Sequence, residues 1–211
     1  MSVTPVRPTA TAVRWPLPVA LAIPALAAAL VIAFTPGHSA GFGLIVFGGF
    51  ALLTAVGSLL GAALLPVGVA RRLSLAKGVA ALAGGIAAIV IAATGLAGVT
   101  VEGAAVALEL VIGATLLLIA VADLATGIRE RHRDRYARDW IATGVVEALG
   151  AVAVVAVPPG FSNVATVRDA VSELTASVMM VGIFGAVAAV LGVLLVIAGI
   201  TLVPSRARAA A

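Results

Sequence analysis

The sequence has 211 residues, of which 63% are hydrophobic and only 10% are charged. A soluble domain has about a quarter charged residues, and so few charges could not cover a soluble surface. The composition therefore predicts an integral membrane protein and excludes an ordinary soluble domain. The net charge of +4 does not indicate nucleic-acid binding, because the arginines lie at the ends of apolar runs and few aromatic residues could stack on bases. Anionic lipid headgroups are the expected charged partner.

Six apolar runs follow one another along the chain, and each has about the 20 residues needed to cross a bilayer core. A Pro/Thr-rich tail at 1–14 precedes them, and a short basic tail at 204–211 follows. The sequence therefore predicts an all-α integral membrane protein with six transmembrane helices. The predicted spans are 15–34, 42–65, about 78–96, about 103–124, 140–157 and about 177–203.

The basic residues indicate the topology. Twelve of the thirteen lie in the two tails and in the second and fourth loops, which an even number of crossings places on one side. The positive-inside rule then predicts a multi-pass protein of the inner (plasma) membrane with both termini in the cytoplasm. A competing interpretation treats the first run as a cleaved signal peptide. The topology anchors and headgroup contacts are predicted to be Arg71, Arg72, Arg129, Arg131, Arg133, Arg135, Arg138 and the interfacial Trp140.

A repeat appears when alternate runs are compared. The second, fourth and sixth runs share a short pattern at Phe47-Gly48, Ile112-Gly113 and Phe184-Gly185, and the third and fifth share equally spaced glycines at Gly78/Gly84 and Gly144/Gly150. Small residues let helices approach closely in lipid. The repeat predicts three helical hairpins. Gly57 and Gly61 are expected to serve packing within the chain, with homo-oligomer formation as the alternative.

The loop before the sixth run is long enough to have its own structure. Its apolar residues recur at three- and four-residue spacing, which predicts an amphipathic helix over about 164–176. This helix could cover the outer face of the bundle, or it could act as a lid or a partner-docking element.

Glu147 and Glu109 are the main candidates for chemistry. Glu147 lies seven residues into the predicted fifth span, roughly 10 Å deep, and Glu109 lies six residues into the fourth, roughly 9 Å from the opposite side. Intramembrane carboxylates are costly when ionised and often functional. Each is therefore a candidate proton or polar-ligand site, or else a protonated acid bonded to a neighbouring helix. Their depths predict that they do not pair directly.

The other polar residues have simpler interpretations. Asp139 is expected to be the N-cap of the fifth helix, and Asp123 is expected to pair with an arginine of the following loop. His38 could sense external acid, although a solvated loop histidine is the simpler alternative. His38 and His132 are predicted on opposite sides of the membrane, so no metal site is expected.

No catalytic signature is recognisable in the sequence. It has no Gly-x-Ser-x-Gly elbow, no phosphate-binding loop and no His-Glu-x-x-His motif. The absence of cysteine also excludes thiol nucleophiles and thiolate metal sites. We therefore expect a non-enzymatic protein without a cofactor.

The segment from Trp140 to Gly160, together with the six runs and the Gly-centred even spans, resembles the HdeD family of small bacterial inner-membrane proteins, which are built from a two-helix repeat. In that family the fifth helix can carry an acid three residues after a glycine, which is the position of Glu147 after Gly144. The first run and Glu109 have no clear counterpart. The resemblance implies a role in acid or envelope stress, or as a membrane partner or scaffold. The alternative is a small proton-linked transporter or permease that uses Glu147 and Glu109.

Overall fold

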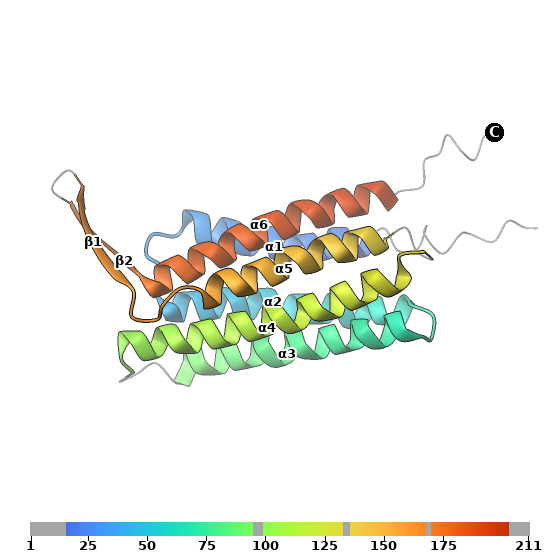
Figure 1. The fold of residues 1–211 in the computed structure, drawn as a ribbon, viewed down its shortest axis with the longest axis horizontal. Helices are drawn as coiled ribbons and strands as arrows, with labels where there is room; N and C mark the ends of the chain where they lie inside the picture. The colour runs from blue at the N-terminus through green and yellow to red at the C-terminus, as the bar shows by residue number, and fades with distance from the viewer. Residues whose placement is uncertain (1–15, 95–98, 133–135, 168–169, 203–211) are drawn as a thin grey trace, which may run out of the picture.

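The chain folds as a bundle of long helices with a β-hairpin at one end (Figure 1). The structure, a computed structural model, describes residues 16–94, 99–132, 136–167 and 170–202. The predicted tails at 1–14 and 204–211 lie outside these residues. The elements in chain order are α1 (Pro16–Phe34), α2 (Ala40–Leu64), α3 (Val69–Thr94), α4 (Val101–Glu130), α5 (Ala137–Val155), β1 (Ser162–Val167), β2 (Ala170–Thr175) and α6 (Ala176–Leu202).

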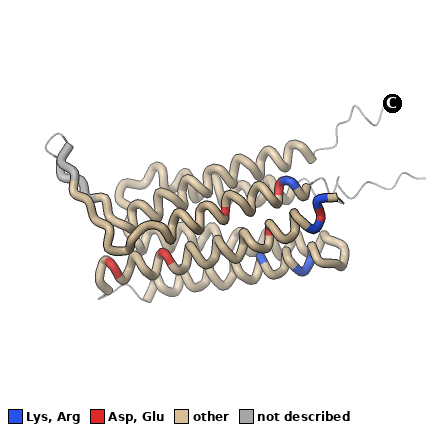
Figure 2. The backbone as a smooth tube through the Cα atoms, in the orientation of Figure 1, with Lys and Arg blue, Asp and Glu red and all other residues tan. Residues whose placement is uncertain are grey.

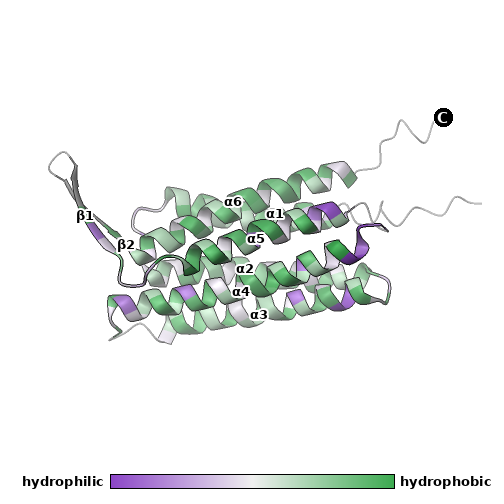
Figure 3. Cartoon of the chain, viewed as in Figure 1, coloured by the Kyte–Doolittle hydropathy of each residue, from purple (hydrophilic) through white to green (hydrophobic). Residues whose placement is uncertain are grey.

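Five of these helices, α1 to α4 and α6, are long and apolar enough to cross a membrane. Large apolar side chains such as Leu53, Leu118 and Ile200 are exposed on the outside of the bundle, and hydrophobic residues make up most of each helix (Figure 3). A soluble protein would bury much of this surface. The chain is therefore a multi-pass membrane protein. The remaining helix, α5, has only 19 residues, so every stretch of 18 residues within it contains its three charges, Arg138, Asp139 and Glu147.

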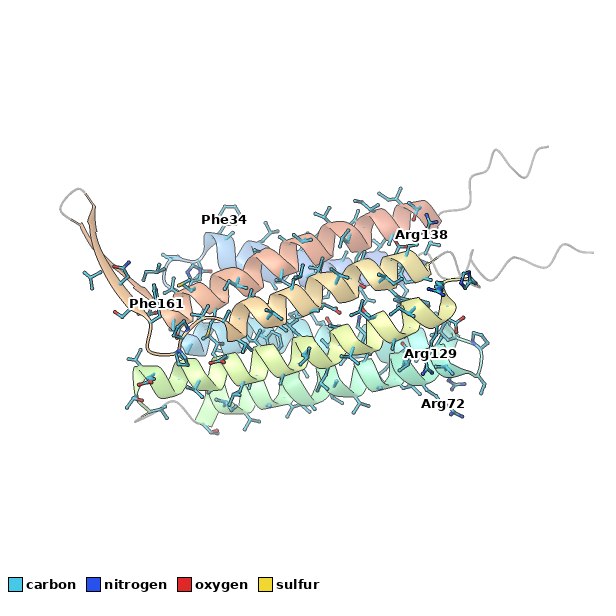
Figure 4. All side chains as sticks on the ribbon, viewed as in Figure 1. Phe34, Arg72, Arg129, Arg138 and Phe161 are labelled. Atoms are coloured by element: carbon cyan, nitrogen blue, oxygen red, sulfur yellow. The ribbon has the colours of Figure 1, made fainter. Side chains whose placement is uncertain are left out.

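The two ends of the bundle differ in charge. Arg72, Arg129 and Arg138 lie at one end, called here the arginine end, where α1 begins and α6 finishes (Figures 2 and 4). Phe34 and Phe161 lie at the opposite end, called the hairpin end (Figure 4). The arginines that the positive-inside rule predicted on one side of the membrane therefore lie at one end of the bundle, as far as the structure describes them. Arg133 and Arg135 lie outside the described residues.

The even-numbered helices form the inner part of the bundle. Phe47, Ile112 and Phe184, which begin the repeated pattern on α2, α4 and α6, are fully buried in one core cluster. The rings of Phe47 and Phe184 meet edge-to-face with centroids 5.2 Å apart, a favoured aromatic geometry. The sequence repeat therefore marks the place where the three inner helices meet.

The closest helix pairs are α2 with α3, α4 with α5, and α1 with α6. The hairpins predicted from the repeat, α1–α2, α3–α4 and α5–α6, also pack together but less extensively. Glycines explain the difference. A Cβ atom on Gly144 of α5 would lie 3.0 Å from the Leu124 nitrogen of α4, and one on Gly192 of α6 would lie 3.2 Å from the Leu26 nitrogen of α1. Backbones approach this closely only where a side chain is absent.

Gly57 and Gly61 of α2 face Leu21 and Leu17 of α1. These two glycines therefore serve packing inside the chain, as the simpler interpretation of the sequence had it. The contact places α1 against the inner helix at the arginine end.

Two helices extend beyond the spans predicted from hydropathy. The third helix begins at Val69 rather than near residue 78, and the fourth ends at Glu130 rather than near residue 124. Helical hydrogen bonds are internal, so a helix need not stop where its apolar run stops. As a result, Arg71 and Arg72 lie inside α3 rather than in a loop, and Lys77 lies well within the helix.

The prediction of an amphipathic helix at 164–176 is wrong. The segment forms an antiparallel hairpin whose register runs from Ser162 opposite Thr175 to Val167 opposite Ala170, and the hairpin projects beyond the helices (Figure 1). The segment is rich in valine and threonine, which favour strands. Spacings of three and four residues occur by chance in so short a segment, so the periodicity did not distinguish a helix from two short strands.

Candidate functional site

Three charged side chains from three helices meet inside the bundle: Lys77 of α3, Asp123 of α4 and Glu147 of α5. The Lys77 Nζ atom lies 2.5 Å from Asp123 Oδ2 and 3.7 Å from Glu147 Oε1. The side chains of Asp123 and Glu147 are buried, and that of Lys77 is only 15% exposed. We call these residues the charged triad.

The charged triad lies deep within the helices. Lys77 is eight residues from the start of α3, Asp123 is seven from the end of α4, and Glu147 is ten from the start of α5. At 1.5 Å per residue these depths are about 12, 10 and 15 Å from the arginine end. Ions at such depth are stable only when they pair with one another or line a wet cavity. Lys77 is the counterion that both carboxylates need.

A hydroxyl group supports one member of the charged triad. The Thr143 hydroxyl lies 3.2 Å from Asp123 Oδ2 and is also within hydrogen-bond distance of the carbonyl oxygens of Asp139 and Trp140. Because one hydroxyl has one proton, it donates to one of these acceptors at a time. Thr143 therefore links α5 to the acid on α4.

Glu147 Oε2 is the exception to this pairing. Within the described residues it is the buried side-chain oxygen that has no hydrogen-bond partner, although Glu147 itself is only 4% exposed. Buried polar atoms almost always have a partner, and an unpaired one is costly. The charges also indicate that a positive partner is missing. One ammonium and two carboxylates carry a net charge of −1 when all are ionised, and one proton or one bound cation would neutralise it.

The charged triad lines a cavity that extends from the middle of the bundle to the arginine end. Its empty space, the region at its mouth included, is about 1120 Å³. The wall formed by α2, α3, α4 and α5 is polar and contains the charged triad with Thr54, Ser58, Ser74, Thr126 and Thr143. The opposite wall, formed by α1 and α6, is apolar and contains Leu17, Leu21, Ala25, Leu191, Leu195 and Leu202.

The repeat explains how one cavity has two kinds of wall. Eleven residues after Phe47, Ile112 and Phe184, which is three helical turns, the inner helices carry Ser58, Asp123 and Leu195. All three positions line the cavity. Equivalent helix faces thus carry a hydroxyl, a carboxylate and an apolar group.

Two aromatic residues lie where α5 begins, toward the mouth of the cavity. Tyr136 and Trp140 both line it, and their rings meet edge-to-face with centroids 5.0 Å apart. Trp140 was predicted to be an interfacial anchor. It lies near the arginine end and lines the cavity, and its role as an anchor stays a prediction.

The other predicted candidate, Glu109, does not belong to this site. It lies 14 residues from Asp123 on α4, about 21 Å toward the hairpin end. It is partly exposed and does not line the cavity. The expectation that Glu109 and Glu147 do not pair agrees with this separation.

Three further expectations are corrected. Asp123 pairs with Lys77 instead of a loop arginine. The N-cap of α5 is Tyr136, and Asp139 lies within the first turn, where its charge still favours the helix dipole. His38 is half-buried rather than simply solvated, and its Nε2 atom lies 2.8 Å from the Ile32 carbonyl oxygen near the end of α1.

Sequence reasoning missed Lys77, which was taken only as a charge at the start of a helix. One signal could have drawn attention to it, since it is the only lysine in a chain whose other twelve basic residues are arginines. Its partners come from two other helices, so spacing along the sequence could not reveal them.

Comparisons with family models, with curated proteins and with solved structures found no match for this chain. The fold and the site themselves define the class: a multi-pass helical membrane protein with a buried ionic cluster facing an internal cavity.

Proposed function

We propose that the protein is a small proton-linked permease of the inner membrane, with six spans and both termini in the cytoplasm, and that Glu147 takes up and releases the proton. The observation that carries the proposal is the unpaired, buried Glu147 Oε2 in a triad with one more acid than base. A purely structural ion pair needs only one carboxylate for one ammonium. The second carboxylate is available to exchange a proton with the cavity.

The shape of the cavity supports an access mechanism. Its lining residues run from Phe50, whose ring meets that of Phe184 in the apolar core with centroids 5.4 Å apart, to Leu202 at the arginine end. Glu147 is therefore reached from the arginine end. Transport would require a second state in which the inner helices part at Phe50 and Phe184 and the arginine end closes.

The test is proton flux in proteoliposomes after a pH step, followed with an internal pH indicator. Wild-type protein is expected to dissipate the gradient, and Glu147→Gln is expected to lose at least about 90% of the protein-dependent rate, because an amide cannot carry the proton. Glu109→Gln is the matched control and should retain the wild-type rate. Equal flux in wild type and Glu147→Gln, or none in either, would overturn the proposal.

A second candidate is an HdeD-like role in acid or envelope stress through a membrane partner. The observation that favours it is the β-hairpin, which projects beyond the helices and exposes Val164 and Leu174. The test is purification in native lipid with wild-type protein and with residues 162–175 replaced by a short Gly/Ser linker. A stoichiometric partner lost only with the hairpin supports this role, and the same partners in both preparations contradict it.

A further inference from the structure

The cavity contains features that select the charge of a ligand. Lys77 already contacts both carboxylates, so its positive charge is engaged within the charged triad. The group without a partner is an acceptor, Glu147 Oε2. An incoming cation would gain an ion pair there, whereas an anion would have to displace a carboxylate from Lys77.

The walls select the rest of the ligand. Leu191 and Leu195 of α6 and Leu21 of α1 face the cavity across from the charged triad. Removing apolar surface from water at this wall favours a ligand with an apolar body. The aromatic rings of Tyr136 and Trp140 toward the mouth offer faces that attract cations.

We propose that this cavity is the binding site for a small organic amine, whose ammonium group contacts Glu147 Oε2 and whose apolar body packs on the α1–α6 wall. The assignment deepens the proposed function and rests on it only for the coupling to transport. When Glu147 carries a proton, the arriving ammonium takes its place: the O–H bond breaks, the proton leaves for water, and the carboxylate pairs with the cation. Amine and proton therefore compete for one oxygen atom.

The surroundings of Glu147 define this competition. The charged groups that face it are Lys77 from α3 and Asp123 from α4. The lining residues of α1 and α6 are apolar, and those of α2 that are polar, Thr54 and Ser58, are hydroxyl residues. Tyr136, at the start of α5, also lines the cavity and adds a phenol group to its titratable side chains. Raising the pH from acid to neutral should therefore strengthen amine binding by removing the competing proton.

The experiment compares three probes with one phenyl body and different head groups: 2-phenylethylamine, 2-phenylethanol and 3-phenylpropionate. The protein is held in nanodiscs of lipids that carry no net charge, and binding is measured by calorimetry at neutral pH. The amine is cationic at this pH because alkylamines have a pKa near 10. Repetition in buffers of different ionisation enthalpy counts the protons released. We expect saturable binding of the amine at least about tenfold tighter than that of the other two probes, with release of up to one proton.

Three variants identify the site. Glu147→Gln should weaken amine binding about tenfold or more and abolish proton release. Leu195→Trp keeps every charge and fills the apolar side, so it should also prevent binding. Glu109→Gln should bind as wild type does. Circular dichroism selects the variants that remain folded, and Leu195→Trp tests the site even if Glu147→Gln unfolds.

The outcomes are decisive. Equal affinity for the alcohol, tighter binding of the carboxylate, or unchanged amine binding in Glu147→Gln would overturn the assignment. Amine binding without proton flux in proteoliposomes that hold the amine on one side of the membrane would support this site and contradict the permease proposal. Proton flux without amine binding would do the reverse.

Discussion

At the residue scale, Lys77 determines whether the interior of the bundle can hold two acids. Its Nζ atom contacts carboxylates from two other helices, so one side chain joins α3, α4 and α5. Removing one partner of a buried ion pair usually costs about 3–5 kcal/mol, because the remaining charge is left without compensation. Lys77 is thus expected to be a stabilising residue as well as part of the site.

Lys77→Met should lower the midpoint of thermal unfolding, measured by circular dichroism in detergent, because two carboxylates would then face each other without a counterion. The matched double variant adds Asp123→Asn. In the Lys77→Met background this second change should cost much less than in wild type, or stabilise, since it removes one uncompensated charge. Additive effects of the two changes would show that the pair does not interact.

The sequence identified Glu147 but not its surroundings. A carboxylate in an apolar run can be recognised from the sequence because acidic residues inside membrane spans are rare and usually functional. Its counterion comes from 70 residues earlier in the chain, and which face of α3 meets α5 depends on packing. For the same reason Glu109 and Glu147 looked equivalent in sequence, although only Glu147 lines the cavity.

At the element scale, glycine positions determine which helices pair most closely. On α5, Gly144 faces the backbone of α4, with a Cβ position 3.0 Å from the Leu124 nitrogen and 3.1 Å from the Ala120 carbonyl oxygen. On α2, Gly49 has open space around its Cβ position. An added methyl group therefore reports on helix packing at Gly144 and on helix propensity at Gly49.

Gly144→Ala should destabilise the protein by about 1–3 kcal/mol, because the added methyl group forces α4 and α5 apart. Gly49→Ala should be neutral or stabilising by up to about 1 kcal/mol, since alanine favours a helix more than glycine does. Thermal unfolding of both variants in the same detergent checks the contrast. Similar losses of stability at the two positions would contradict the close approach at Gly144.

Elements were predicted well where hydropathy was sufficient and poorly where it was not. The apolar runs located the helices, including α5 with its buried Glu147. Their ends were misjudged at Val69 and Glu130 because charged residues continue a helix beyond an apolar run. The hairpin was missed because a strand pair depends on partners across a turn, and a single-segment periodicity does not contain that information.

At the scale of the whole molecule, the helices form a closed arrangement in which the first packs on the last. The α1–α6 pair buries Ile32 against Gly185, where a Cβ atom on Gly185 would lie 3.3 Å from the Ile32 Cβ atom. This closure supplies the apolar wall of the cavity. It could not be predicted from the sequence repeat, which indicated hairpins of consecutive helices.

The closure can be tested by cross-linking, because the chain has no cysteine of its own. The variant Ile32→Cys/Gly185→Cys should form a disulfide on mild oxidation, since the separation is close to the Cβ–Cβ distance of about 3.5–4.5 Å in disulfides. After cleavage at a protease site inserted between α2 and α3, the two fragments should migrate together on a non-reducing gel. Ile32→Cys/Gly182→Cys is the control and should separate, because a Cβ atom on Gly182 of α6 would meet nothing within 4 Å. Separation of both variants would contradict the α1–α6 contact.

The pairing of α1 with α6 also has a consequence for biosynthesis. Helix α1 is made before α6 and remains in the membrane without its partner until α6 has been made, so that the buried small residues Ala22, Ala25 and Ala28 lack their final cover. A nascent chain that ends after α5 contains all three charges of the triad but only half of the apolar wall around them. Lipid would then face Lys77 and Glu147 from the side, where charged groups are costly. Completion of α6 is thus the step at which an ionic cluster open to lipid becomes an enclosed one, and chains that stop short of it should be targets for membrane proteases.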